Sequence, residues 1–156
     1  MSERTSAGIL LYRHAGGRLE VLLAHPGGPY FANRSVGDWT IPKGEPDDPG
    51  EPMRDVARRE FAEETGTAIH AAAAAIELGT IVQKGGKVVY AWAVEGDLDP
   101  AVAHSNLFEM EWPPKSGRRE LFQEIDRVAW FEPDEARLMI KPTQAPFIDR
   151  LEAALL

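Results

Sequence analysis

Residues 44–66 read GEPDDPGEPMRDVARREFAEETG, and this stretch decides the fold. Its first part, residues 44–50, is rich in proline, glycine and aspartate and is therefore predicted to be a loop. Residues 51–65 have the composition and periodicity of a helix, and Gly66 lies where helices commonly end. The stretch thus predicts a loop that leads directly into a helix over residues 51–65.

The predicted helix carries acidic side chains beside its apolar stripe. The stripe is formed by Met53, Val56, Ala57 and Phe61. At about 100° per residue, Glu60, Glu63 and Glu64 project into this stripe or its margin, at spacings where helical side chains meet. Two carboxylates about 5 Å apart repel by roughly 3 kcal/mol at an effective dielectric near 20, which is more than surface pairing offsets.

A divalent cation between the carboxylates would offset this repulsion. Oxygen-only ligands select Mg²⁺, Mn²⁺ or Ca²⁺ over Zn²⁺, and Mg²⁺ typically binds a few carboxylates and bridges substrate phosphates. The alternative is a solvated acidic helix whose glutamates pair with Arg58 and Arg59. Helical spacing alone favours that alternative, and the flanking residues reverse the preference.

The flanking residues carry a family resemblance. Gly44, Glu51, Arg59-Glu60, Glu63-Glu64 and Gly66 resemble the Nudix box, Gly-x5-Glu-x7-Arg-Glu-U-x-Glu-Glu-x-Gly-U, with Phe61 at the first U. Two positions depart from the pattern: six residues separate Gly44 from Glu51 where five are usual, and Thr67 replaces the last aliphatic residue. The extra residue lies in the loop, where an insertion moves no ligand on the helix. The resemblance implies an α/β fold, the Nudix α/β/α sandwich with a mixed β-sheet.

The resemblance also implies a metal site and a catalytic set. The residues expected to ligate Mg²⁺, or Mn²⁺ as a substitute, are Gly44, Glu60, Glu63 and Glu64, with the same glutamates positioning the attacking water. Arg59 is expected to orient these carboxylates, and Glu51 to support them without touching the metal. Glu51 could instead be an ordinary acid at a helix N-terminus. Members of the family often supply a further glutamate as general base or ligand, for which Glu124 is the better candidate and Glu120 the weaker; the alternative for Glu124 is a surface carboxylate.

Several other residues are candidates for substrate binding. Trp39-x-x-Pro42-Lys43-Gly44 resembles the branch that hydrolyses diadenosine polyphosphates, and Lys43 could place its ammonium group on a phosphate oxygen. In residues 108–119, a base could stack on Trp112 with Lys115 or Arg118 near phosphate. Alternatively, Lys43 and Arg118 are plain surface residues and Trp112 pins a long loop to the core.

The rest of the chain predicts a sheet with flanking helices in one domain over residues 1–156. Strands are expected at 5–13, 19–25, 76–82, 87–95 and 128–131, with helices at 133–140 and 143–155. The alanine run 71–75 is assigned to a strand edge, and 96–124 to a long connection that could close over the substrate.

Composition excludes several kinds of function. With 17 basic and 25 acidic residues, the net charge is -8, which argues against binding a nucleic-acid backbone. The chain has no cysteine and therefore no thiolate chemistry. It has neither an export signal nor a membrane-length apolar run, so we expect a cytoplasmic protein without membrane contact. The four histidines lack metal-ligand spacing and are expected at the surface or in hairpins.

We therefore expect a Mg²⁺-dependent pyrophosphohydrolase that cleaves a phosphoanhydride bond in a nucleoside diphosphate derivative, such as a dinucleoside polyphosphate or a nucleoside triphosphate. Its partner would be a small-molecule nucleotide, and the chain could be a monomer or a homodimer. The alternative is a non-catalytic Nudix-fold module that senses a nucleotide, which the altered loop length allows. The prenyl diphosphate isomerases of this fold need a cysteine, and the chain has none.

Overall fold

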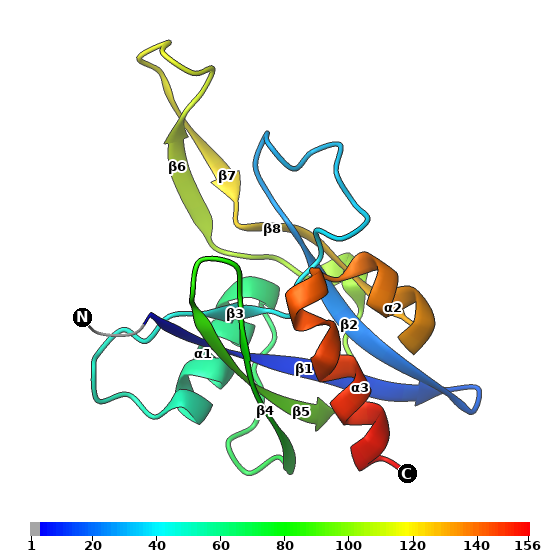
Figure 1. Ribbon diagram of the computed structural model, residues 1–156. Helices are drawn as coiled ribbons and strands as arrows, with labels where there is room; N and C mark the ends of the chain where they lie inside the picture. The colour runs from blue at the N-terminus through cyan, green and yellow to red at the C-terminus, as the bar shows by residue number, and fades with distance from the viewer. Residues whose placement is uncertain (1–3) are drawn as a thin grey trace.

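A six-stranded mixed sheet forms the centre of the molecule (Figure 1). The computed structural model describes residues 4–156. The strands of this sheet are β1 (Thr5–Ala15), β2 (Arg18–Pro26), β3 (Lys43–Gly44), β4 (Ala75–Val82), β5 (Val88–Glu95) and β8 (Ile125–Phe131). They follow the order β4-β5-β1-β2-β8, with β3 paired to β1. Only β1 and β5 run parallel, so the mixed sheet expected from the sequence is confirmed.

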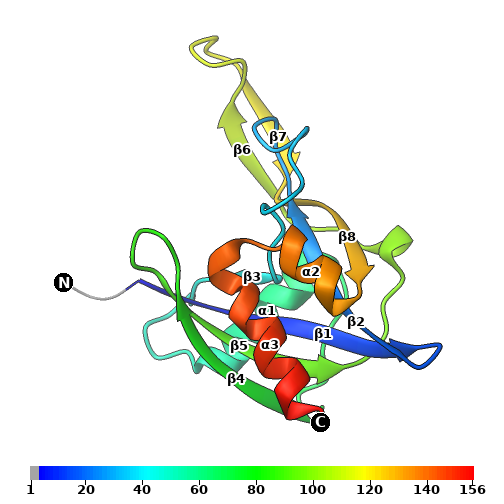
Figure 2. The ribbon, with the colours of Figure 1, turned by 45° about the vertical axis from the view of Figure 1, so that its right-hand side comes forward.

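Helices cover the two faces of this sheet. α1 (Met53–Thr65) packs on one face, and α3 (Ala145–Ala154) lies on the other beside α2 (Pro133–Met139) and the short 3-10 turn η2 (Pro142–Gln144), as Figures 1 and 2 show. No helix among residues 4–156 is long and apolar enough to cross a membrane.

Strict alternation along β1 supplies both layers of the core. Ile9 and Leu11 pack on the α1 side with Phe61, whereas Leu10 packs on the α3 side with Phe147. All five side chains are at most 2% exposed. Full burial of an apolar side chain of this size stabilises the fold by about 1.5–3 kcal/mol. The α/β/α sandwich is thus a consequence of two apolar faces on one strand.

The first hairpin and the box helix agree closely with expectation. β1 and β2 join through Gly16 and Gly17, whose positive φ angles of 59° and 79° suit a tight turn. α1 begins at Met53 rather than at residue 51 because Pro52 is extended, and it ends at Gly66, whose φ is 78°. The box therefore folds as a loop and a helix of the predicted kind.

Three sequence predictions are wrong in detail. The alanine run 71–75 contributes only its last residue to a strand, because residues 71–74 form a turn and β4 starts at Ala75. The 96–124 connection is not irregular throughout, since it holds the 3-10 turn η1 (Pro100–Val102) and a separate hairpin of β6 (Leu107–Glu111) and β7 (Arg119–Gln123). The last helix starts at Ala145, after the η2 turn, rather than at residue 143.

Candidate functional site

The site is built where β3 passes the last two turns of α1. Gly44 lies against Glu60 so closely that a Cβ atom on Gly44 would be 2.0 Å from the Glu60 Oε2 atom. Only glycine leaves room for the carboxylate at this point. The glycine of the box and its first helical glutamate therefore belong to one close contact, despite the extra residue in the loop between them.

Glu64 is the most deeply buried acid of the helix. It is 9% exposed, and its Oε2 atom accepts a hydrogen bond from the backbone N–H of Lys43 at 2.9 Å. Burial, reinforced by the nearby charge of Glu60, raises the pKa of Glu64 to about 8. Burial is also the main cause that raises the pKa of Glu60. Both carboxylates are thus held where a negative charge lacks solvation.

Arg59 holds the surrounding acids in place. Its guanidinium donates to Glu51 at 3.0 Å and to Glu60 at 2.8 Å, and it lies 3.4 Å from Glu63. These contacts, with Glu51 as the largest cause, raise the pKa of Arg59 above its usual value. A planar fork of five N–H donors suits such multiple carboxylate contacts, which a lysine could not reproduce.

Glu124 approaches the same group of acids through backbone pairing. The Glu124 N–H donates to the Asn106 carbonyl at 2.9 Å, and the Asn106 N–H donates to the Glu63 carbonyl at 3.1 Å. Partial burial, followed by the charge of Glu63, raises the pKa of Glu124. The structure therefore brings Glu124, which is 61 residues after Glu63, to the glutamate end of α1.

The donor chemistry of this site fits a hard divalent cation. Glu60, Glu63 and Glu64 offer only oxygen atoms, and two of them are carboxylates whose burial penalises the charge. Across residues 4–156, no three acidic or histidine side chains converge closely enough to form a complete ligand set by themselves. Water and phosphate oxygens would complete the coordination of Mg²⁺, which commonly keeps several waters.

The other predicted substrate residues lie on the β6–β7 hairpin. Lys115 and Arg118 are exposed at its tip, and Trp112 makes a T-shaped contact with Tyr30 at 5.3 Å. The hairpin projects away from α1 in both views (Figures 1 and 2), so these three residues are not placed against the glutamates. Their contribution to substrate binding stays a prediction.

One histidine contradicts the sequence expectation. His25 lies on β2 of the first hairpin but not at the surface: it is fully buried, with Nδ1 2.8 Å from Asp126 Oδ1 and Nε2 2.5 Å from the Arg34 carbonyl oxygen. It therefore ties β2 and β8 to the loop after β2. Its partner carboxylate is 101 residues away, so no local pattern could have indicated it.

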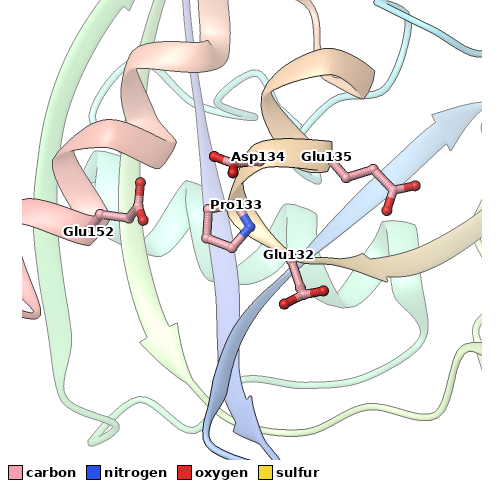
Figure 3. Close-up of a pocket in the computed structure, with 5 residues that line it drawn as sticks. All are labelled: Glu132, Pro133, Asp134, Glu135 and Glu152. Atoms are coloured by element: carbon pink, nitrogen blue, oxygen red, sulfur yellow. The ribbon is translucent and has the colours of Figure 1, made fainter.

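A second acidic region lies on the opposite layer of the sandwich. A cavity of about 340 Å³ beside α2 and α3 (Figure 3) is lined by Glu132, Pro133, Asp134, Glu135 and Glu152. The Asp134 and Glu152 carboxylates pair with Arg137. The cavity contains none of the residues predicted for the site.

Comparisons with known proteins identify the family and the fold. The sequence model of the NUDIX domain matches residues 2–151. The Nudix domain of Shewanella oneidensis NrtR, solved with ADP ribose, has a TM-score of 0.69 and 14% identity over 100% of this chain and 90% of that one. A C. elegans Ap4A hydrolase has a TM-score of 0.66 and 20% identity, covering 96% and 97%.

A mutT/nudix family protein from Listeria innocua has a TM-score of 0.63 and 17% identity, covering 99% of this chain and 95% of that one. These structural likenesses concern the fold. Comparison with curated protein sequences finds no match. Because the NUDIX sequence model spans nearly the whole chain and the box residues meet in one site, the chain belongs to the Nudix family.

Proposed function

We propose that this chain is a Mg²⁺-dependent pyrophosphohydrolase that cleaves a phosphoanhydride bond in a nucleoside diphosphate derivative. The observation that carries the proposal is the buried Glu64 carboxylate, which accepts the Lys43 N–H and senses the charge of Glu60, the glutamate that lies against Gly44. Burying like charges costs stability unless a cation accompanies them. The C. elegans Ap4A hydrolase supports a hydrolase of nucleotides as the activity.

The chain's own residues would divide the work as follows. Glu60, Glu63, Glu64 and the Gly44 carbonyl would hold the cation, which, when bound, supplies Lewis acidity at the phosphate oxygens. Arg59 fixes the direction of the Glu60 carboxylate and would keep it from turning toward solvent. Glu51 in turn holds Arg59 and is not proposed as a ligand of the cation.

Glu124 is the residue proposed to take the proton from the attacking water. It is exposed, so a water can reach it, and its backbone is fixed beside the carboxyl end of α1. Its raised pKa makes it a better base than an ordinary surface glutamate, because a stronger base accepts a proton more readily. Lys43 is proposed to contact a substrate phosphate.

A panel of phosphoanhydrides tests this function. Dinucleoside polyphosphates, nucleoside triphosphates and nucleotide sugars would be incubated with the protein and Mg²⁺, with Mn²⁺ as a second condition and EDTA as the control. We expect release of a nucleoside monophosphate or diphosphate from at least one class, abolished by EDTA. Absence of turnover across the whole panel would contradict the proposal.

A second candidate function is nucleotide sensing without cleavage. Two observations favour it: the loop before Glu51 is one residue longer than in the box pattern, and Arg59 already contacts three of the acids. The Nudix domain of NrtR was solved with ADP ribose and has the same fold. Calorimetry that shows tight nucleotide binding, with no product after prolonged incubation with Mg²⁺, would establish sensing in place of hydrolysis.

A further inference from the structure

A three-residue segment, residues 104–106, is bound to the end of α1. It lies between η1 and β6. The His104 N–H donates to the Thr65 carbonyl at 3.0 Å, and the Asn106 N–H donates to the Glu63 carbonyl at 3.1 Å. Carbonyl groups in the last turn of a helix have no partner within the helix, so these bonds satisfy groups that would otherwise need water. The segment is therefore fixed to the turn of α1 that carries the last glutamates of the box.

Three backbone groups beside the Glu124 Cα atom are hydrogen-bonded. The Glu124 N–H donates to the Asn106 carbonyl at 2.9 Å, and the Glu124 carbonyl accepts from the Gly27 N–H at 2.8 Å. The N–H of the next residue, Ile125, donates to the Ser105 Oγ atom at 3.0 Å. Because peptide groups are planar, holding the groups on both sides of a Cα atom also fixes the direction of its Cα–Cβ bond. These partners therefore set the direction in which the Glu124 side chain leaves the backbone.

One of these partners is a side chain. Ser105 is half-buried, and its Oγ atom accepts the Ile125 N–H. Its own O–H can donate to the Ile125 carbonyl or to the Asn106 carbonyl, which are both 3.0 Å away. A serine hydroxyl has one donor and two acceptor positions, so it can bind an N–H and a carbonyl at the same time. The hydroxyl thus joins the segment 104–106 to the residue directly after Glu124.

Gly27 holds the same peptide group from the other end. A Cβ atom on Gly27 would lie 1.9 Å from the Gln123 carbonyl oxygen, so only glycine allows this close approach. Its N–H reaches the Glu124 carbonyl. The peptide group between Glu124 and Ile125 is therefore held at its carbonyl by the residue after β2 and at its N–H by Ser105.

The position of this peptide group matters for the chemistry proposed for Glu124. A general base must lie within about 2.6–3.2 Å of the atom whose proton it takes. The Glu124 side chain is exposed, so its placement depends mainly on the backbone from which it starts. Its carboxylate also lies close enough to Glu63 for that charge to contribute to its raised pKa. A shift of the backbone at residues 124–125 would therefore move the base relative to the glutamates of α1.

We propose that Ser105 is a positioning residue: its hydroxyl holds the peptide group after Glu124 beside α1 and thereby keeps the Glu124 carboxylate within reach of the attacking water. This inference rests on the proposed hydrolase function, with Glu124 as the base. Ser105 lies outside the Nudix box and acts through Glu124, without contact of its own to the reacting atoms.

Steady-state kinetics of Ser105→Ala test the role. The substrate is whichever of diadenosine tetraphosphate, ATP and ADP-ribose the wild type cleaves fastest in Mg²⁺. We expect kcat to fall about tenfold, because a displaced base takes the proton less readily. KM should stay within about twofold, because the proposed substrate-binding groups are unchanged. Ser105→Cys keeps the size of the side chain but replaces the hydroxyl by a weak hydrogen-bonding thiol, and its kcat should also fall.

Ser35→Ala is the matched control. Ser35 is also half-buried, and its Oγ atom accepts a hydrogen bond from the Trp39 Nε1–H at 3.1 Å. The variant therefore removes a hydroxyl of the same kind from a segment that does not contact the peptide group after Glu124. Its kcat and KM should stay within about twofold of wild type, and a tenfold loss of kcat in this variant would overturn the assignment.

A double-mutant cycle with Glu124→Gln distinguishes positioning from a general weakening of the fold. If Ser105 acts through Glu124, Ser105→Ala should change kcat by no more than about twofold once the base is absent. Its effect in the wild-type background should also not exceed that of Glu124→Gln. An unchanged kcat in Ser105→Ala, a change in KM alone, or the same tenfold loss in the Glu124→Gln background would each refute the role.

Amide hydrogen exchange, followed by NMR without metal or substrate, measures the hydrogen bond itself. Ile125 is buried, and its N–H loses its acceptor in Ser105→Ala. We expect this amide to exchange about tenfold faster or more, whereas Ser35→Ala should leave it unchanged. Thermal melts should show a folded Ser105→Ala protein whose melting temperature is about 2–4 °C lower, as for one lost hydrogen bond. Unchanged exchange at Ile125 would refute the link.

The two kinds of measurement separate this inference from the hydrolase proposal. If wild type cleaves none of the three substrates while exchange at Ile125 accelerates in Ser105→Ala, the hydrolase and the positioning role are both refuted, and only the hydrogen-bonded link remains. If wild type cleaves a substrate and folded Ser105→Ala has a normal kcat, the hydrolase stands and Ser105 is not a positioning residue.

Discussion

Two acidic regions of this molecule have similar composition and opposite surroundings. On α1, Glu60 and Glu64 have side chains that are 12% and 9% exposed, and their burial raises both pKa values. In the cavity of Figure 3, Asp134 is fully exposed and Glu152 is 41% exposed. Both regions gather several carboxylates around an arginine, Arg59 in the first and Arg137 in the second.

The difference between the two regions lies in solvation. Water and Arg137 stabilise the carboxylates of the cavity, so these acids need no further partner. Glu60 and Glu64, in contrast, are largely shielded from water. The Glu60 carboxylate occupies the space that a side chain at position 44 would take. A count of acids therefore does not distinguish the two regions, whereas burial combined with a fitted backbone does.

The largest expected effect is that of Glu64→Gln. Glutamine can still accept the Lys43 N–H bond, so the fold is kept, but it removes a negative ligand. We expect kcat in Mg²⁺ to fall by about 10³-fold or more, with the melting temperature in EDTA within about 3 °C of wild type. Steady-state assays and thermal melts measure the two quantities. A near-normal kcat would show that Glu64 is not a metal ligand.

Gly44→Ala should have the next largest effect. The new Cβ atom would lie 2.0 Å from Glu60 Oε2, so the carboxylate or β3 must move. We expect a destabilisation of about 1–3 kcal/mol in denaturant unfolding and a loss of activity of at least about tenfold. Gly50→Ala is the matched control, because its Cβ would meet no atom within 4 Å. Equal behaviour of the two variants would contradict the close contact.

Arg59→Lys tests the frame around the carboxylates. A lysine keeps the charge but cannot donate to Glu51 and Glu60 in the same planar arrangement. We expect kcat to fall about tenfold to a hundredfold through the misdirected carboxylate, with a smaller change in KM. Arg54→Lys on the exposed side of the same helix should be neutral. A lysine variant with wild-type kcat would show that orientation by Arg59 is dispensable.

The smallest effect should come from the β6–β7 hairpin. Trp112→Ala removes the T-shaped contact with Tyr30, which is worth about 0.5–1.5 kcal/mol. Because the β6–β7 hairpin that carries Trp112 projects away from α1, kcat should change little, while KM for a nucleotide should rise several-fold if a base stacks there. An unchanged KM with every substrate would show that Trp112 does not bind the substrate.

The sequence alone predicted the strands whose side chains alternate against a core and the helix whose side chains recur at helical spacing. The strands β1, β2 and β5 and the helix α1 follow from such local patterns, and so does the position of Glu60, Glu63 and Glu64 on one helix. The β6–β7 hairpin was missed because neither of its faces is fully buried, so its alternation lacks a consistently apolar side. Most of the alanine run was misassigned because alanine has no strong preference against a turn, and only Ala73 and Ala75 pack against the core.

The remaining site features depend on contacts between distant segments. The Lys43 N–H meets the Glu64 carboxylate only because β3 pairs with β1 beside α1, and no local pattern predicts that contact. The pairing of His25 with Asp126 is of the same kind. Position along the chain could suggest Glu124 as a candidate, yet its proximity to α1 depends on the backbone pairing of Asn106.

A Mn²⁺ titration followed by electron paramagnetic resonance tests the central claim most directly. Free Mn²⁺ gives a signal that disappears on binding, so wild type, Glu64→Gln and Glu135→Gln can be compared under the same conditions. We predict one or more sites in wild type and in Glu135→Gln, and the loss of at least one site in Glu64→Gln. Equal Mn²⁺ binding by all three proteins, or no binding by wild type, would contradict a cation at the helix glutamates.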